Sequence, residues 1–179
     1  MAERLRSMGL TRRPSYFARE ATLDDLDALT SIQDARDLHE RRLRPGGASY
    51  HPENRVFLVE RAGEAVGYVH AVFVRPPGTP GCGDRSGLPF LQSFIIKEGN
   101  RRRGAGTFLF QYVAEAIRER GYRSVYLTVE IDNLGALRLY ERLGFRRTNR
   151  PVKPTSSEEG DVPAIELVEH FTEDKCRNR

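Results

Sequence analysis

The 179-residue sequence lacks several features that mark specialised classes of protein. Its two cysteines, Cys82 and Cys176, cannot build a disulfide scaffold, and neither belongs to a C-x-x-C pair of the kind that holds zinc. No apolar run approaches the roughly 20 residues of a membrane span, and the N-terminus has no apolar secretory segment. These absences predict a soluble, cytoplasmic protein with no membrane partner and no metal site.

Lysine is also scarce, at three of 29 basic residues, and the arginines are spread along the whole chain. The formal net charge is +4, but four arginines against Glu3 place +3 of it within residues 1–13, so the remainder is nearly neutral. A nucleic-acid-binding protein concentrates positive charge on one segment or face. We therefore expect no nucleic-acid partner.

The chain does have the composition of one folded domain. Hydrophobic residues make up 39% of it, with nine phenylalanines and seven tyrosines, which is enough for a sizeable core. Residues 1–14 lack periodicity and are expected to form a flexible basic arm. Residues 15–172 are expected to form a single domain, and residues 173–179 a C-terminal tail.

Periodicity divides the domain into strands and helices in the order β, α, α, β, β, β, α, β, α, β, β. Strands are expected at 16–19, 56–59, 65–73, 90–96, 125–129, from 145 onward and at 164–171. Helices are expected after Thr22, through 35–43, from Gly106 to Gly121, and from Asp132 or Asn133 to Gly144. This order predicts an α/β (α+β) mixed sheet with a parallel crossover between Phe90 and Val129.

Two loops separate these elements. Residues 75–89 are so rich in proline and glycine that they are expected to form a loop, and a loop of this length is a candidate lid that helps to select the substrate. Residues 154–160 are expected to form a polar loop before the last strand.

A turn with the sequence Arg101-Arg102-Arg103-Gly104-Ala105-Gly106 joins a strand to a helix. Backbone N–H groups and the positive end of the helix dipole converge there, which favours binding of an anion such as a phosphate. No Gly-Lys-Ser/Thr follows, and Leu109 stands where a dinucleotide fingerprint requires glycine. Nucleoside triphosphates and NAD are therefore poor candidates.

A second pattern, Asn133-x-x-Ala136-x-x-x-Tyr140, places an amide, a small side chain and a phenol on one face of a helix that Gly144 ends. Alone, this stripe is more typical of a helix packed on a core. It begins 27 residues after Gly106, and the joint spacing of the two patterns is specific.

Together, Arg101-x-x-Gly104-x-Gly106 and Asn133-x-x-Ala136-x-x-Leu139-Tyr140-x-x-x-Gly144-Phe145 resemble the acetyl-CoA-binding core of the GNAT superfamily of N-acetyltransferases. The segment from Arg19 to Leu29 is similar to the family's opening. The resemblance implies a central, mostly antiparallel mixed sheet with a splayed parallel pair, flanked by about four helices. The long loop at 75–89 and Glu98, where many members have proline, depart from the pattern.

The resemblance also implies where acetyl-CoA would bind as co-substrate. The edge of one strand would pair with the pantetheine arm, the backbone N–H groups of 102–107 would hold the pyrophosphate, and an amide would bind the arm from the other side. The cofactor-binding residues implied are Phe94, Ile95, Ile96, Arg101, Arg102, Arg103, Gly104, Ala105, Gly106, Thr107, Asn133, Ala136 and Tyr140.

For catalysis, the resemblance implies that the N–H of Ile96 stabilises the oxyanion and that Tyr140 protonates the departing thiolate. Glu98, Glu130 and His70 are alternative general bases. The other three histidines, at 39, 51 and 170, are expected to lie at the surface or to pack, without metal spacing.

The expected reaction is direct attack of a primary amine on acetyl-CoA in a ternary complex. The two cysteines lie outside both motifs, which disfavours a thiol nucleophile. The acceptor would be a small-molecule or peptide amine bound by residues 36–51 and the loops at 75–89 and 151–161. A non-catalytic CoA-binding sensor or interaction module of the same fold is the alternative, and a homodimer stays open.

Overall fold

A computed structural model describes residues 16–47, 49–74, 87–152, 155–157 and 160–171. The expected basic arm, the C-terminal tail, most of the Pro/Gly loop and both cysteines lie outside these residues. The predictions made for them are therefore neither supported nor opposed by the fold.

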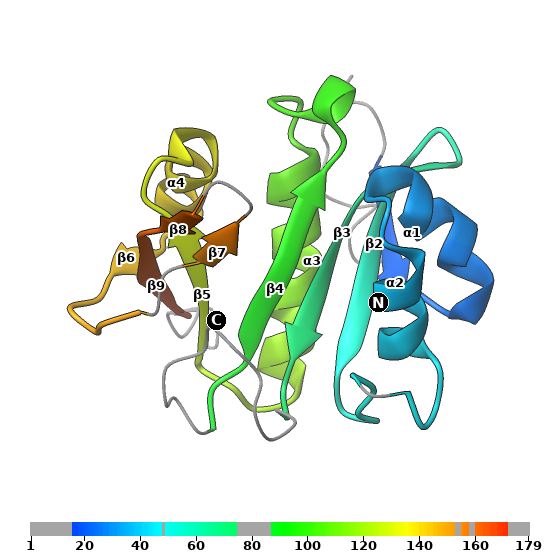
Figure 1. Cartoon of the computed structure of the whole chain (residues 1–179), viewed down its shortest axis with the longest axis horizontal. Helices are drawn as coiled ribbons and strands as arrows, with labels where there is room; N and C mark the ends of the chain where they lie inside the picture. The colour runs from blue at the N-terminus through cyan, green and yellow to red at the C-terminus, as the bar shows by residue number, and fades with distance from the viewer. Residues whose placement is uncertain (1–15, 48, 75–86, 153–154, 158–159, 172–179) are drawn as a thin grey trace, which may run out of the picture.

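Seven strands form one mixed sheet, in agreement with the predicted order (Figure 1). Only β4 and β5 run parallel, and all other neighbours are antiparallel. In spatial order the strands are β1 (Tyr16–Glu20), β2 (Arg55–Arg61), β3 (Glu64–Val72), β4 (Phe90–Ile96), β5 (Ser124–Glu130), β9 (Ala164–His170) and β6 (Arg146–Arg147).

Helices cover both faces of this sheet, because side chains that alternate along each strand are apolar on both sides. Leu58 and Tyr68 pack with Leu29 under α1 (Leu26–Ile32) and α2 (Arg36–Leu43), while Val59 and Val69 pack in the core cluster that contains α3 (Ala105–Glu119) and α4 (Leu134–Arg142). Short 3₁₀ turns at Leu23–Asp25 and Glu98–Asn100 complete the helical segments. None of the described helices is both long and apolar enough to cross a membrane.

One predicted loop contains strands. Residues 154–160 were expected to form a polar loop, but β7 (Thr155–Ser157) and β8 (Gly160–Val162) pair as a small antiparallel hairpin. Three-residue strands are too short to show a period of two, and the polar composition of this segment is typical of a loop. These two strands could therefore not be predicted from local patterns.

The parallel pair at the centre of the sheet opens along its length. Strands β4 and β5 share one registered pair, Phe90 with Tyr126, whereas β5 and β9 pair over seven residues from Ser124 to Glu130. After Phe90 the two strands diverge, as Figure 1 shows. The remaining length of β4 thus presents an edge that the described sheet does not cover.

Candidate active site

The open edge of β4 directs backbone donors away from β3. The N–H of Lys97 donates to the carbonyl of Val66 on β3 at 2.9 Å. Successive N–H groups of a strand point to opposite edges, so the N–H of Ile96 points toward the diverging β5. This is the donor that the family resemblance assigns to the oxyanion.

A bulge interrupts β4 just before this donor. Tyr68 pairs with Ile95 and His70 with Gln92, so the strand holds one residue more than its partner. Ser93 lies in this bulge with φ of 54°, a left-handed conformation that is costly for a residue with a side chain. Bulges bend a strand and re-aim the residues that follow, which here are those of the open edge. No sequence signal marked this serine.

The arginine turn has a backbone geometry that favours an anion. Arg102 and Gly104 have φ of 55° and 94°, and glycine adopts the second value without a steric penalty. The first helical hydrogen bond of α3 runs from the N–H of Phe108 to the carbonyl of Gly104 at 2.9 Å. The N–H groups of Ala105 and Thr107, with that of the residue between them, therefore have no partner inside the helix.

Three arginines of this turn line a hollow. A hollow of about 590 Å³ is lined by Glu98, Gly99, Arg101, Arg102 and Arg103. Three guanidinium groups against one carboxylate, together with the positive end of α3, favour an anionic ligand such as a pyrophosphate.

Two contacts hold the turn in place. The Nε of Arg101 donates to the carbonyl of Ile96 at 3.0 Å, which ties the turn to the end of β4. The hydroxyl of Tyr16 donates to the carbonyl of Arg103 at 3.0 Å, and its ring lies 5.8 Å from that of Phe108. Sequence reasoning missed Tyr16, which lies 87 residues before the carbonyl it binds.

Gly106 lies where the start of α3 packs closely on neighbouring elements. A Cβ there would lie 3.2 Å from Leu139 Cδ2 and 3.7 Å from Ile96 Cγ1. The missing side chain thus allows α3, α4 and the end of β4 to pack closely. The structure brings the two sequence motifs together at this point.

Helix α4 begins at Leu134, and the Oδ1 of the preceding Asn133 accepts from the N–H of Ala136 at 3.1 Å. Asn133, not Asp132, is therefore the N-cap. The cap uses only the amide oxygen, so the Nδ2 group of the same side chain could still donate to a ligand. The exposed position of Asn133 is consistent with that use.

Tyr140 lies on the inner face of α4, with only 7% of its surface exposed. Its ring is 6.1 Å from that of Phe94 on β4 and 5.5 Å from that of Phe145. Burial raises the pKa of Tyr140 well above its ordinary value, so the phenol is protonated at neutral pH. A protonated phenol beside the open edge of β4 can donate a proton there.

The three candidate bases occupy different surroundings. Glu98 is exposed and lines the arginine hollow. Glu130 is half-buried at the end of β5, on the same side of the strand as Tyr126 by strand alternation. His70 is only 3% exposed, and burial lowers its pKa to about 3. The structure therefore argues against His70 and leaves the two glutamates.

The remaining histidines behave as packing or surface residues, as expected. The ring of His39 packs edge-on against Tyr68, and the Nδ1 of His170 lies 2.7 Å from the hydroxyl of Ser124. Across the described residues, no group of three or more His, Cys, Asp or Glu side chains is arranged to hold a metal ion.

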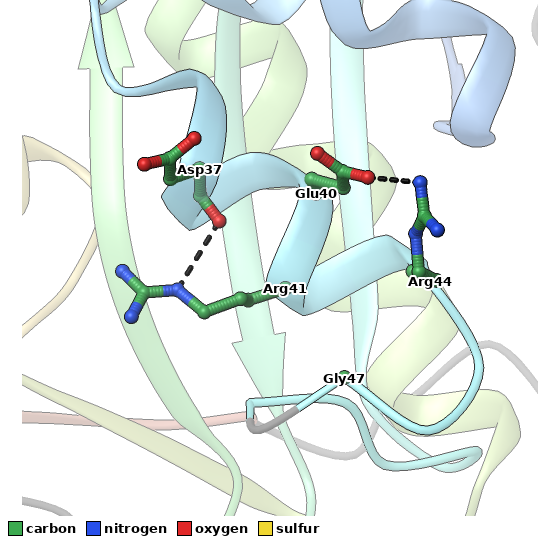
Figure 2. A pocket seen from close by; sticks show the side chains of 5 residues that line it. All are labelled: Asp37, Glu40, Arg41, Arg44 and Gly47. Atoms are coloured by element: carbon green, nitrogen blue, oxygen red, sulfur yellow. Dashed lines mark hydrogen bonds and ion pairs between the residues drawn. The ribbon is translucent and has the colours of Figure 1, made fainter.

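A second hollow, of about 370 Å³, lies beside α2 within the segment expected to bind the acceptor (Figure 2). Its charged side chains pair locally: Arg44 bonds to Glu40, and the Nε of Arg41 donates to the carbonyl of Asp37 at 3.2 Å. Gly47 completes the lining of this hollow.

Known proteins share this sequence pattern and fold. Residues 18–145 match the sequence profile of the acetyltransferase (GNAT) family. An N-alpha-acetyltransferase from Sulfurisphaera tokodaii is 31% identical over 146 residues, which are 73% of this chain and 80% of that protein. The chain spans between 36% and 61% of the length of four further curated relatives.

Two solved structures show the same fold at low identity. The ribosomal-protein-S18-alanine N-acetyltransferase from Escherichia coli has a TM-score of 0.67 at 17% identity, covering 92% of this chain and 99% of that one. A GNAT family acetyltransferase from Elizabethkingia anophelis with acetyl-CoA bound has a TM-score of 0.59 at 16% identity, covering 87% and 98%. With the profile match over more than half of its length, the chain belongs to the GNAT family of acetyltransferases.

Proposed function

We propose that the protein transfers an acetyl group from acetyl-CoA to a primary amine, most directly the α-amino group of a peptide, in a ternary complex. One observation carries the proposal: the open edge of β4, the arginine turn and Tyr140 of α4 meet in one place. The packing of Gly106 against Leu139 and Ile96, and the contact between the Phe94 and Tyr140 rings, support this juxtaposition.

The residues present fit acetyl-CoA. The pyrophosphate would accept hydrogen bonds from the N–H groups at the start of α3, with Arg102 and Arg103 offsetting its charge. The pantetheine arm would pair with the open edge of β4 as an added strand, and the Nδ2 of Asn133 would donate to it. Ala136 would leave space on the same face of α4. The pyrophosphate would thus meet N–H groups that have no partner inside α3, and the pantetheine arm would meet the uncovered edge of β4.

The chemistry follows from the same geometry. Glu130, directly or through a water molecule, would remove a proton from the ammonium group, since its half-buried carboxylate ends the strand beside the opening. The N–H of Ile96 would stabilise the negative charge on the carbonyl oxygen as the nitrogen–carbon bond forms. Tyr140 would donate its proton to the sulfur as the carbon–sulfur bond breaks. Glu98 is the alternative base.

The peptide α-amine is the first acceptor to test because of the relatives' names. An N-alpha-acetyltransferase and a ribosomal-protein-alanine N-acetyltransferase are among the similar proteins. A small-molecule amine is the second class. We propose that residues 15–172 form the single catalytic domain. A homodimer and a cytoplasmic location stay predictions.

Calorimetry with acetyl-CoA, followed by a thiol-release assay over peptides and small amines, tests the proposal. We expect binding, and CoA release that depends on one amine class. Binding without release for any amine would favour the alternative, a CoA-binding sensor or interaction module. Absence of binding would contradict both.

A further inference from the structure

A buried arginine lies under the bulge of β4 without a carboxylate partner. Arg42, on α2, is only 6% exposed. Its Nη1 atom is buried and has no hydrogen-bond partner, and none of the ion pairs found among the described residues involves it. Arginine is seldom buried unless it is paired, so this position needs an explanation.

The contacts of Arg42 link α2 to the strand that carries the open edge. Its Nη2 donates to the hydroxyl of Ser93 at 3.1 Å. The hydroxyl of Tyr68 lies beside both groups and donates to Gln33 in the connection between α1 and α2. The guanidinium therefore sits among neutral polar groups, directly below the bulge.

Stability does not account for this arrangement. Removal from water lowers the pKa of Arg42 more than the neighbouring hydroxyl of Tyr68 raises it. A well-packed hydrophobic side chain in place of a buried ion is often neutral or stabilising. A buried arginine without a carboxylate partner among the described residues breaks a local rule of folding, and such exceptions are typical of functional sites.

Ser93, which accepts the hydrogen bond from Arg42, is also strained. Ser93 has φ of 54°, and its hydroxyl is fixed by the guanidinium. The orientation of this residue determines how the following backbone, through Ile96, faces the opening between β4 and β5. An error of about 1 Å in the placement of a reacting group can cost ~10²-fold in rate.

We propose that Arg42 is a positioning residue: its hydrogen bond to Ser93 fixes the β4 bulge and thereby aims the N–H of Ile96 at the acyl carbonyl. The inference rests on the proposed function. It also makes α2, which borders the expected acceptor side, a support for the strand that binds the co-substrate.

The first test replaces Arg42 by methionine, with Arg118→Met as a matched control on the distant end of α3. For Arg42→Met we expect kcat to fall by at least ~10-fold and by up to ~10²-fold. The melting temperature should be unchanged or higher, and the Kd for acetyl-CoA, which depends on the arginine turn, should change little. Arg42→Lys, which keeps a donor, should recover part of kcat. Arg118→Met should keep the wild-type kcat.

The second test changes Ser93 and applies if Arg42→Met fails to fold. Ser93→Gly loses the hydrogen bond but removes the backbone penalty, whereas Ser93→Ala loses the bond and keeps the penalty. Both should lower kcat, while only Ser93→Gly should raise the melting temperature. The double variant Arg42→Met/Ser93→Gly should be no slower than the slower single variant, because both remove one interaction.

Two results would overturn the inference. One is a wild-type kcat in Arg42→Met or in both Ser93 variants. The other is a lower melting temperature in Arg42→Met with unchanged kcat for the folded fraction, which would make Arg42 a structural residue. Failure of the proposed function is distinct: the wild-type protein itself would then release no CoA with any amine.

Discussion

Replacement of Tyr140 by phenylalanine tests the proton donor with little disturbance of the fold. The ring contacts with Phe94 and Phe145 survive, and only the hydroxyl is lost. The structure gives that hydroxyl no hydrogen bond to a described residue, so the variant should be as stable as the parent. Acetyl-CoA should bind with unchanged affinity.

The expected loss of rate comes from the pKa of Tyr140. A general acid contributes about 10²- to 10⁴-fold when its pKa suits the leaving group. A free phenol has a pKa of about 10 and a thiol about 8.5, and each further unit of difference opposes complete proton transfer by ~1.4 kcal/mol. Burial raises the pKa of Tyr140, which makes it a weaker acid, so we expect the low end of the range, ~10²-fold or ~2.7 kcal/mol.

Single-turnover thiol release at saturating acetyl-CoA and amine measures this loss without a contribution from product release. The matched control is Tyr112→Phe, because Tyr112 is also partly buried with a raised pKa and packs against Phe57 at 5.9 Å, away from the opening. The control should keep the parental rate. Equal rates for both variants would refute the assignment of Tyr140 as the acid.

Three further perturbations have defined outcomes. Gly106→Val should abolish acetyl-CoA binding in calorimetry, since a branched side chain would meet Leu139 and separate α3 from α4; retained affinity would contradict this packing role. Tyr16→Phe, which loses one hydrogen bond to the arginine turn, should weaken binding by about 2- to 10-fold, and no change would mean that the turn is held without it. His70 is neutral in the folded protein down to a pH of about 3 but takes a proton in the unfolded chain below its ordinary pKa of 6.5. The free energy of unfolding should therefore decrease as the pH falls from 6.5 toward 3, by up to ~1.4 kcal/mol per unit, and urea denaturation of His70→Gln should show a shallower decrease.

Local patterns predicted the elements around the site. The spacing from Asn133 to Tyr140 depends only on the period of one helix, and Gly144 ends that helix with φ of 98°. The turn from Arg101 to Gly106 was likewise predicted from a strand end, two glycines and a helix start. These features depend on only a few neighbouring residues, so they can be predicted well from the sequence.

Contacts between distant segments could not be predicted in this way. The hydroxyl of Tyr16 donates to a carbonyl 87 residues later in the sequence, and Arg42 donates to Ser93, 51 residues later. The bulge at Ser93 depends on the register between two strands, which no period within one strand reveals. The packing of Gly106 against Leu139 could not be predicted either, because Leu139 belongs to another helix. Local sequence patterns predicted the type of each element, but they did not predict which elements pack against one another.

Transfer of a labelled acetyl group tests the central claim most directly. The protein is incubated with acetyl-CoA carrying an isotope-labelled acetyl group and with peptides that have a free or a blocked N-terminus, and the products are located by tandem mass spectrometry. We expect one labelled acetyl group on the α-amine of the free peptide for each CoA released, and none on the blocked peptide. Release of CoA without a labelled amine, or no release from bound acetyl-CoA with any amine, would contradict it.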